Sequence, residues 1–188
     1  LLYQMYEEKG YNRRDIPTLI LKNNLVCMDV DKRAAQLTSF ALVMKARSIN
    51  PRFFSPAYYT LPQVLELLDS QLLISLEYRK RMEELKVFSK PEINEIGRLV
   101  STFTEGKTIG SLIKVPELNY ILLRDICDRL EKQITTAFNV DFLSYGVELM
   151  RKLILQAEML AASYDVMITN PPYLGISKME KSVKDYAA

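Results

Sequence analysis

The segment Asn170-Pro171-Pro172-Tyr173 contains the residues of this chain best suited to chemistry. It follows the apolar run Val166-Met167-Ile168, which predicts a buried strand beginning near Tyr164. The two prolines end that strand, because neither can donate to a ladder and each holds the preceding residue extended. The result would be a stiff loop at the carboxyl end of a strand, where open α/β sheets bind ligands.

This loop suits an exocyclic amine on an aromatic ring. Such an amine is a poor nucleophile because its lone pair is delocalised into the ring. The side-chain oxygen of Asn170 and the next backbone carbonyl, rigidly aimed by Pro171, could accept hydrogen bonds from the amine as it attacks an electrophilic methyl group. Tyr173 offers a face for stacking. The alternative is a plain turn that ends a strand, which Asn-Pro-Pro alone more often is.

Asp29 is the second candidate. It ends the apolar run Leu25 to Met28, and a helix is expected to follow over 32–47. A carboxylate in that place commonly binds a ribose diol in nucleotide-binding folds. The alternative is capping of the following helix. Capping is favoured for Asp31, whereas for Asp29 the two interpretations are equally weighted.

The composition excludes several classes of site. The chain has 188 residues, 48% hydrophobic and 26% charged, with a net charge of +2, which indicates one soluble globular domain without a strong field for nucleic acid or membrane. The absence of histidine excludes Ser-His-Asp and Cys-His catalysis and histidine-based metal sites. Cys27 and Cys127 are predicted to be buried free thiols, typical of a cytoplasmic protein. No apolar run is long enough to cross a bilayer, so we expect neither a metal nor a membrane.

The elements that position the candidates follow from periodicity and turn signals. Helices are predicted over 1–8, ended by Gly10, from Asp15 to about Asn24, over 32–47, over 61–87 as one or two, from Ser89 to about Gly106, over 117–135 and over 142–162. Strands are predicted over 25–28, over 107–115 and from Asp165. The aromatic residues at 53–59 are expected to pack in a loop, and one face of helix 32–47, formed by Leu37, Phe40, Ala41 and Met44, is expected to be buried. This order predicts an α/β fold with parallel strands and crossovers.

Two segments resemble the S-adenosylmethionine-dependent amino-methyltransferases. The segment Asn170-Pro171-Pro172-Tyr173 after an apolar strand is similar to their motif IV, and residues 25–37 are similar to their acidic strand-two motif. Residues 31–47 more closely resemble the large adenine-specific DNA methyltransferases, namely the Eco57I-like type II enzymes and the PglX enzymes of BREX phage-defence systems. The segment 110–116 is also similar to that group.

The resemblance implies a partial Rossmann-like sheet of the class I methyltransferase type, helix-rich overall, with a helical insertion over 50–106. Residues 1–188 would form a single incomplete domain. Asp29 would accept the ribose hydroxyls of S-adenosylmethionine, and Val30 would pack against its adenine ring. Asn170 and Pro171 would hold the N6 amine of an adenine flipped out of double-stranded DNA, with Tyr173 stacked on the base. Restriction or phage-defence subunits are the further partners implied.

Two departures from the family pattern concern the cofactor. The family's glycine-rich loop is not in the chain, and Leu1 is expected to lie just after it. An acid expected near the third strand has no clear match, since Ser111 occupies its place. The target-recognition region usually follows the Asn-Pro-Pro-Tyr loop, yet the chain ends fifteen residues after Tyr173. The chain alone is therefore expected to be inactive and to bind S-adenosylmethionine weakly or not at all.

Two alternatives are weighed against this hypothesis. Protein-glutamine and RNA amino-methyltransferases share the four-residue loop, but they are usually compact between the acidic strand and the loop. Here 140 residues separate Asp29 from Thr169, which argues against them. The other alternative is a helical interaction module of a defence complex, in which the loop has lost its catalytic role.

Overall fold

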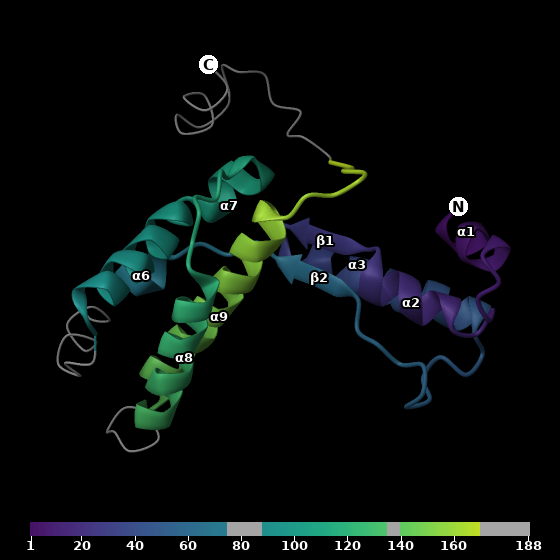
Figure 1. Ribbon diagram of the computed structural model, residues 1–188, viewed down its shortest axis with the longest axis horizontal. Helices are drawn as coiled ribbons and strands as arrows, with labels where there is room; N and C mark the ends of the chain where they lie inside the picture. Colours follow the sequence, from purple (N-terminus) through teal and green to yellow (C-terminus); the bar gives the residue numbers. More distant parts are fainter. Residues whose placement is uncertain (75–87, 135–139, 170–188) are drawn as a thin grey trace. The chain divides into compact units, whose positions relative to one another are not determined.

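The computed structural model describes residues 1–74, 88–134 and 140–169 (Figure 1). The chain forms two compact units, an N-terminal unit of residues 1–67 and a C-terminal unit of residues 68–188. The N-terminal unit contains α1 (Leu2–Glu8), α2 (Ile16–Asn23), β1 (Val26–Asp29), α3 (Lys32–Ile49) and β2 (Gln63–Glu66). The C-terminal unit contains α4 (Gln71–Ile74), α6 (Lys90–Thr102), α7 (Gly106–Ile109), the 3-10 helix η1 (Gly110–Leu112), α8 (Tyr120–Ile134) and α9 (Val140–Ala161).

The centre of the N-terminal unit is a parallel pair of strands joined by a helix. β1 and β2 pair from Val26 opposite Gln63 to Asp29 opposite Glu66, and α3 connects them while contacting both. Parallel strands need such a crossover. The predicted α/β arrangement is therefore confirmed for two strands, whereas the described residues contain no larger Rossmann-like sheet.

Three helix ends form as the sequence predicts. Gly10 follows α1 with φ 83°, and the hydrogen bond from Gly10 N to Glu7 O is the Schellman pattern that glycine permits. Asp31 caps α3 through its carboxylate. Ser89 begins α6 in a capping box, since its main-chain N–H donates to Oε2 of Glu92 at 2.7 Å.

The predicted helix over 61–87 is wrong at its start. Residues 63–66 form β2, and α4 follows only after a further turn; residues 75–87 lie outside the described residues. Pro62 restrains Leu61 to extended geometry, and the free edge of β1 supplies hydrogen-bond partners to the next four residues. A short apolar run is compatible with both the helical and the strand periodicity. Pairing with β1 therefore decides that these residues form a strand.

The predicted strand over 107–115 is also wrong. Residues 106–112 form α7 and η1, and Gly110, where the two helices meet, has φ 64°. A β-rich composition alone could not place this segment on a sheet, because a strand needs a neighbour to satisfy its main-chain groups.

The predicted buried strand before the Asn-Pro-Pro-Tyr loop is not formed. Val166, Met167 and Ile168 have no regular secondary structure and are 77%, 74% and 94% exposed. No described strand pairs with this segment, so its main-chain groups have no ladder to join.

The predicted buried face of the helix at 32–47 is wrong as well. The buried residues of α3 are Ala35 and Ala46. Ala46 packs with Leu21 and Phe53, and Leu42 and Val43 are partly buried against this cluster. The residues predicted to be buried, Leu37, Phe40, Ala41 and Met44, are exposed instead. Periodicity alone could not choose between two apolar faces.

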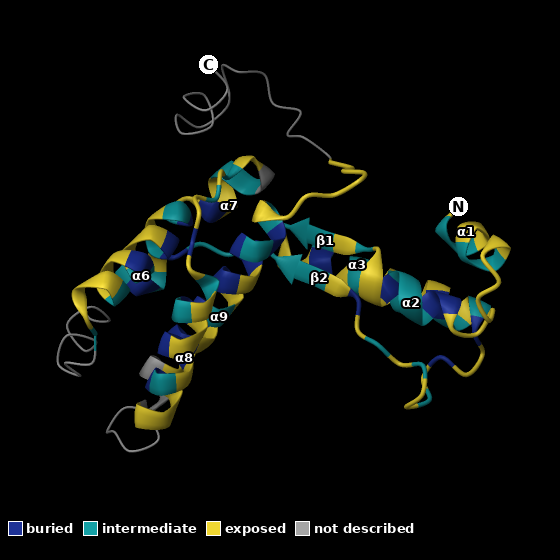
Figure 2. Ribbon diagram, in the orientation of Figure 1, coloured by how far each residue is buried: buried dark blue, intermediate teal, exposed yellow. Residues whose placement is uncertain are grey.

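The C-terminal unit has a helical core. α8 and α9 lie antiparallel and contact each other along their length, as the predicted helices at 117–135 and 142–162 imply, and α6 packs against both (Figures 1 and 2). The fully buried side chains shared among these helices include Leu99, Phe103, Leu123, Ile126, Leu130, Met150 and Leu153. In the N-terminal unit, the ring of Phe53 is fully buried and contacts the rings of Phe54 and Tyr59, which are about half exposed. The packed aromatic loop is therefore confirmed for Phe53 only.

Candidate functional site

The candidate site lies at the carboxyl end of β1, where Asp29 is half-buried. Its Oδ1 accepts a 2.8 Å hydrogen bond from the main-chain N–H of Asp31. Asp31 in turn caps α3, because its Oδ1 accepts from the N–H groups of Arg33 at 2.7 Å and Ala34 at 3.4 Å. The capping interpretation of Asp31 is thus confirmed. The side chain of Asp29 is fixed by the turn, with one oxygen committed to it.

The other carboxylate oxygen of Asp29 is available. Within the described parts of the chain, Oδ2 has no hydrogen-bond partner. The next residue, Val30, is 47% exposed, so an apolar side chain lies next to the carboxylate. An oriented acceptor beside an apolar surface suits a ligand that has hydroxyl donors and a ring.

Glu66 is a second acidic residue at this edge, which the sequence analysis missed. It ends β2 directly opposite Asp29 in the parallel register. Because side chains alternate between the two faces of a sheet, register partners project to the same face. The residue was missed because 61–87 was predicted to be helical. Pro62 followed by an apolar core of two residues is the signal that could have found the strand.

The position expected for the family's third-strand acid is not on a strand. Ser111 lies in η1 of the C-terminal unit. The strand that follows α3 is β2, and its last residue is Glu66.

The loop Asn170-Pro171-Pro172-Tyr173 lies outside the described residues. The structure therefore neither joins it to Asp29 and Val30 nor separates it from them. Its role stays a prediction.

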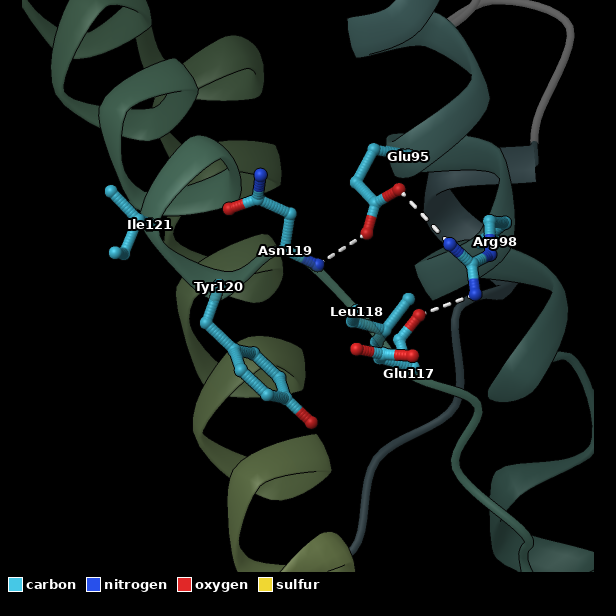
Figure 3. A pocket seen from close by; sticks show the side chains of 7 residues that line it. All are labelled: Glu95, Arg98, Glu117, Leu118, Asn119, Tyr120 and Ile121. Carbon is cyan, nitrogen blue, oxygen red and sulfur yellow. Dashed lines mark hydrogen bonds and ion pairs between the residues drawn. The ribbon is translucent and has the colours of Figure 1, made fainter.

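An open depression of about 510 Å³ lies in the C-terminal unit between α6 and the start of α8 (Figure 3). Oε1 of the buried Glu95 accepts from the N–H of Asn119 at 2.5 Å, and Oε2 pairs with Arg98 at 3.3 Å. Arg98 also donates to the carbonyl of Glu117. Asn119 caps α8 by accepting from the N–H of Leu122 at 3.0 Å. These charges hold a helix start in place, which is a structural role.

A family model described as the Eco57I restriction-modification methylase matches residues 23–188. This match covers nearly the whole chain, including β1, α3, β2 and the unplaced loop. The chain belongs to the Eco57I restriction-modification methylase family.

The curated relatives of this Eco57I-family chain agree with that membership. It is 33% identical over 204 residues to the adenine-specific methyltransferase BrxX of Escherichia coli O9:H4 (strain HS), covering 100% of this chain and 17% of the relative. It is 31% identical over 189 residues to the adenine-specific methyltransferase PglX of Lacticaseibacillus casei (strain Zhang), covering 99% and 15%. The chain thus spans about a sixth of the length of these relatives. The resemblance seen in the sequence is confirmed.

The two thiols of this Eco57I-family chain are free, as predicted, but only Cys127 is buried, whereas Cys27 is half-buried. Burial raises the pKa of the Cys127 thiol to about 11 and also raises the pKa of Cys27. Thiolates are the reactive form, so neither residue is suited to nucleophilic chemistry at neutral pH. No group of metal-ligating side chains occurs in the described ranges, and no helix there is long and apolar enough to cross a membrane.

Proposed function

We propose that the full-length protein containing this chain transfers a methyl group from S-adenosylmethionine to the N6 amine of an adenine in DNA. Family membership and the two relatives named as adenine-specific methyltransferases support the reaction class. The structural observation that carries the proposal is the carboxylate of Asp29. It stands at the carboxyl end of a strand, with one oxygen held by a turn and the other available.

The edge formed by β1 and β2 fits the nucleoside part of the cofactor. Oδ2 of Asp29 would accept the ribose hydroxyls, since a fixed carboxylate is a strong acceptor for two adjacent donors. The exposed Val30 would pack against the adenine ring. Glu66, opposite Asp29, would provide a second carboxylate toward the nucleoside. When bound, S-adenosylmethionine supplies the electrophilic methyl group.

The Asn-Pro-Pro-Tyr loop would hold the target base. The side-chain oxygen of Asn170 and the carbonyl of Pro171 would accept hydrogen bonds from the two N6–H groups, which favours the positive charge that develops on nitrogen. Pro172 would keep the loop extended, and Tyr173 would stack on the flipped adenine. No base is needed to remove a proton beforehand, which agrees with a chain that has no histidine.

Double-stranded DNA is accordingly the proposed substrate, and the proposed setting is a restriction-modification or phage-defence system in the cytoplasm. Flipping the base would cost a few kcal/mol of unstacking, which the full-length protein must recover through DNA contacts. Subunits of the same defence system are the further partners proposed.

The proposal is tested with the full-length gene in its host. Methylation-sensitive sequencing compares the wild type with Asn170→Ala, and N6-methyladenine at the recognised sites should disappear in the variant. The matched control is Asn23→Ala, an exposed asparagine within α2, which should leave methylation unchanged. Unchanged N6-methyladenine in Asn170→Ala, at equal protein level, would remove the catalytic role of the loop.

A further inference from the structure

α3 has two apolar faces on opposite sides. One face, with Ala35 and Ala46, is buried in the N-terminal unit. The other carries Leu37, Phe40 and Met44, which are 67%, 62% and 46% exposed. Residues advance by about 100° along a helix, which places the second face roughly opposite the first. The exposed residues of α3 are yellow in Figure 2.

The spacing of the exposed face is that of a packing surface. Single exposed apolar residues are ordinary and need no explanation. Here, however, three large side chains recur at intervals of three and four over two turns, with Ala41 beside them. A helix that is apolar on two opposite sides is typical of one buried between two layers.

The charges of α3 are one-sided. The helix contains Lys32, Arg33, Lys45 and Arg47 and no acidic residue. Within the described part of the chain, none of these four side chains takes part in an ion pair, whereas Arg124, Arg129 and Arg151 of the C-terminal unit all do. Cations in the first turn also oppose the helix dipole, so Lys32 and Arg33 gain nothing from their own helix. The apolar stripe therefore lies between two basic ends that have no partner in this unit.

We propose that in the full-length protein this face of α3 is covered by an amphipathic helix with acidic flanks, supplied by the remainder of the polypeptide. Its apolar residues would recur at three and four to match Leu37, Phe40 and Met44. Its Asp or Glu residues would meet the basic ends. Because the chain spans only 17% and 15% of its relatives, most of the full-length polypeptide is available to provide that helix. A nucleic acid fits less well, since the centre of the surface is apolar.

Site-directed photo-cross-linking in the purified full-length protein tests this proposal. p-Benzoylphenylalanine replaces Phe40, and the cross-linked peptide is identified by mass spectrometry after irradiation. The expected product is an intramolecular link to a peptide outside residues 1–188 with apolar residues at the stated spacing and acidic flanks. The matched control places the same group at Ile121, which is 82% exposed on α8, and should not link to that peptide. Absence of a link, links confined to residues 1–188, or links between two copies would each overturn the proposal.

Charge reversal and a membrane control make the test sharper. The double variant Arg33→Glu, Arg47→Glu should lower the yield of the Phe40 link by about tenfold, because like charges would then face each other. Replacing the acidic residues of the linked helix by lysine should restore the yield. Circular dichroism should be unchanged, since the substituted side chains are not buried. Flotation of the protein with phosphatidylserine vesicles, together with loss of the position-40 cross-link when the vesicles are present, would show that this face binds a lipid surface. That result would overturn the proposal.

Discussion

Asp29 and Glu66 are the last register pair of the parallel β1–β2 sheet. The main-chain N–H of Leu67 donates to the carbonyl of Asp29 at 2.7 Å, so the pairing holds up to the residue that carries the carboxylate. The two acidic residues therefore share one edge although 36 positions separate them in the chain. This edge is the part of the proposed cofactor site that the structure describes.

Asp29→Asn should weaken S-adenosylmethionine binding by the full-length protein about tenfold to a hundredfold, because hydrogen bonds to a charged group contribute about 1.5–3 kcal/mol. The asparagine oxygen can still accept from the N–H of Asp31, so the turn is kept and only the charge is lost. Isothermal titration measures the change.

The matched control for this variant is Asp31→Asn. Asparagine caps helices about as well as aspartate, so this substitution removes a neighbouring charge while keeping the start of α3. Binding should change by less than about threefold. Equal losses in both variants would mean that the local negative charge, rather than a contact from Asp29, supports the cofactor.

The 188-residue chain alone should bind S-adenosylmethionine weakly or not at all. Its described sheet has only two strands, and its sequence lacks the glycine-rich loop expected in the family. Such a loop commonly supplies main-chain N–H donors that hold an anionic or polar group of the ligand, and the 188-residue chain lacks these donors. Titration of the isolated chain checks this, and a dissociation constant in the micromolar range would contradict it.

The sequence predicted the elements whose signals are local. Asp31 as a cap, Ser89 with Glu92 as a capping box and Gly10 as a helix end depend on groups within a few residues, and all three form. The β1–α3 unit was predicted for the same reason, since a strand, an acid and a cap follow one another directly.

The errors concern partners that lie far away in the sequence. β2 was predicted as a helix because the apolar residues Val64 and Leu65 are compatible with both the helical and the strand periodicity. Only their pairing with β1 distinguishes the two. The buried face of α3 was misassigned because Phe40 and Met44 are more apolar than Ala35 and Ala46. Ala46 is buried against Leu21 of α2, a partner that the periodicity of α3 alone cannot show.

The capping box of α6 should make stability depend on pH in the acid range. Hydrogen bonds from the main-chain N–H and hydroxyl of Ser89, with help from Arg129, lower the pKa of Glu92 below 4.5. A lowered pKa means that the contribution is complete above about pH 4.5 and is lost as the pH falls through the folded-state value. Urea unfolding should show Glu92→Gln less stable than wild type by about 1 kcal/mol at pH 7, with the gap narrowing as the pH falls through the lowered pKa of Glu92. A constant gap from pH 7 to pH 3 would contradict this.

Cys127 should resist alkylation in the folded protein. It is fully buried in the core, and its pKa of about 11 leaves roughly one thiolate in a thousand at pH 8. Iodoacetamide should label the half-buried Cys27 first and reach Cys127 only in denaturant, as peptide mass spectrometry can show. Equal labelling of both thiols without denaturant would mean that the helical core opens far more readily than its packing implies.

Gly106→Ala should destabilise the C-terminal unit by about 1–3 kcal/mol, because overpacking against main chain cannot be relieved by a side-chain movement. A Cβ at this position would overlap the main-chain carbonyl oxygen of Leu68. That carbonyl also accepts a 3.0 Å hydrogen bond from the buried Gln156, whose own oxygen accepts from the N–H of Leu68 at 2.8 Å. Leu68 is therefore held by hydrogen bonds to both its N–H and its carbonyl.

Gly97→Ala is the matched control. A Cβ at this position in α6 meets nothing within 4 Å, and helix propensity predicts that the substitution stabilises the fold by about 0.5–1 kcal/mol. In thermal unfolding, a lower melting temperature for Gly106→Ala and a higher one for Gly97→Ala would establish the close approach at Gly106. A higher melting temperature for both variants would rule it out.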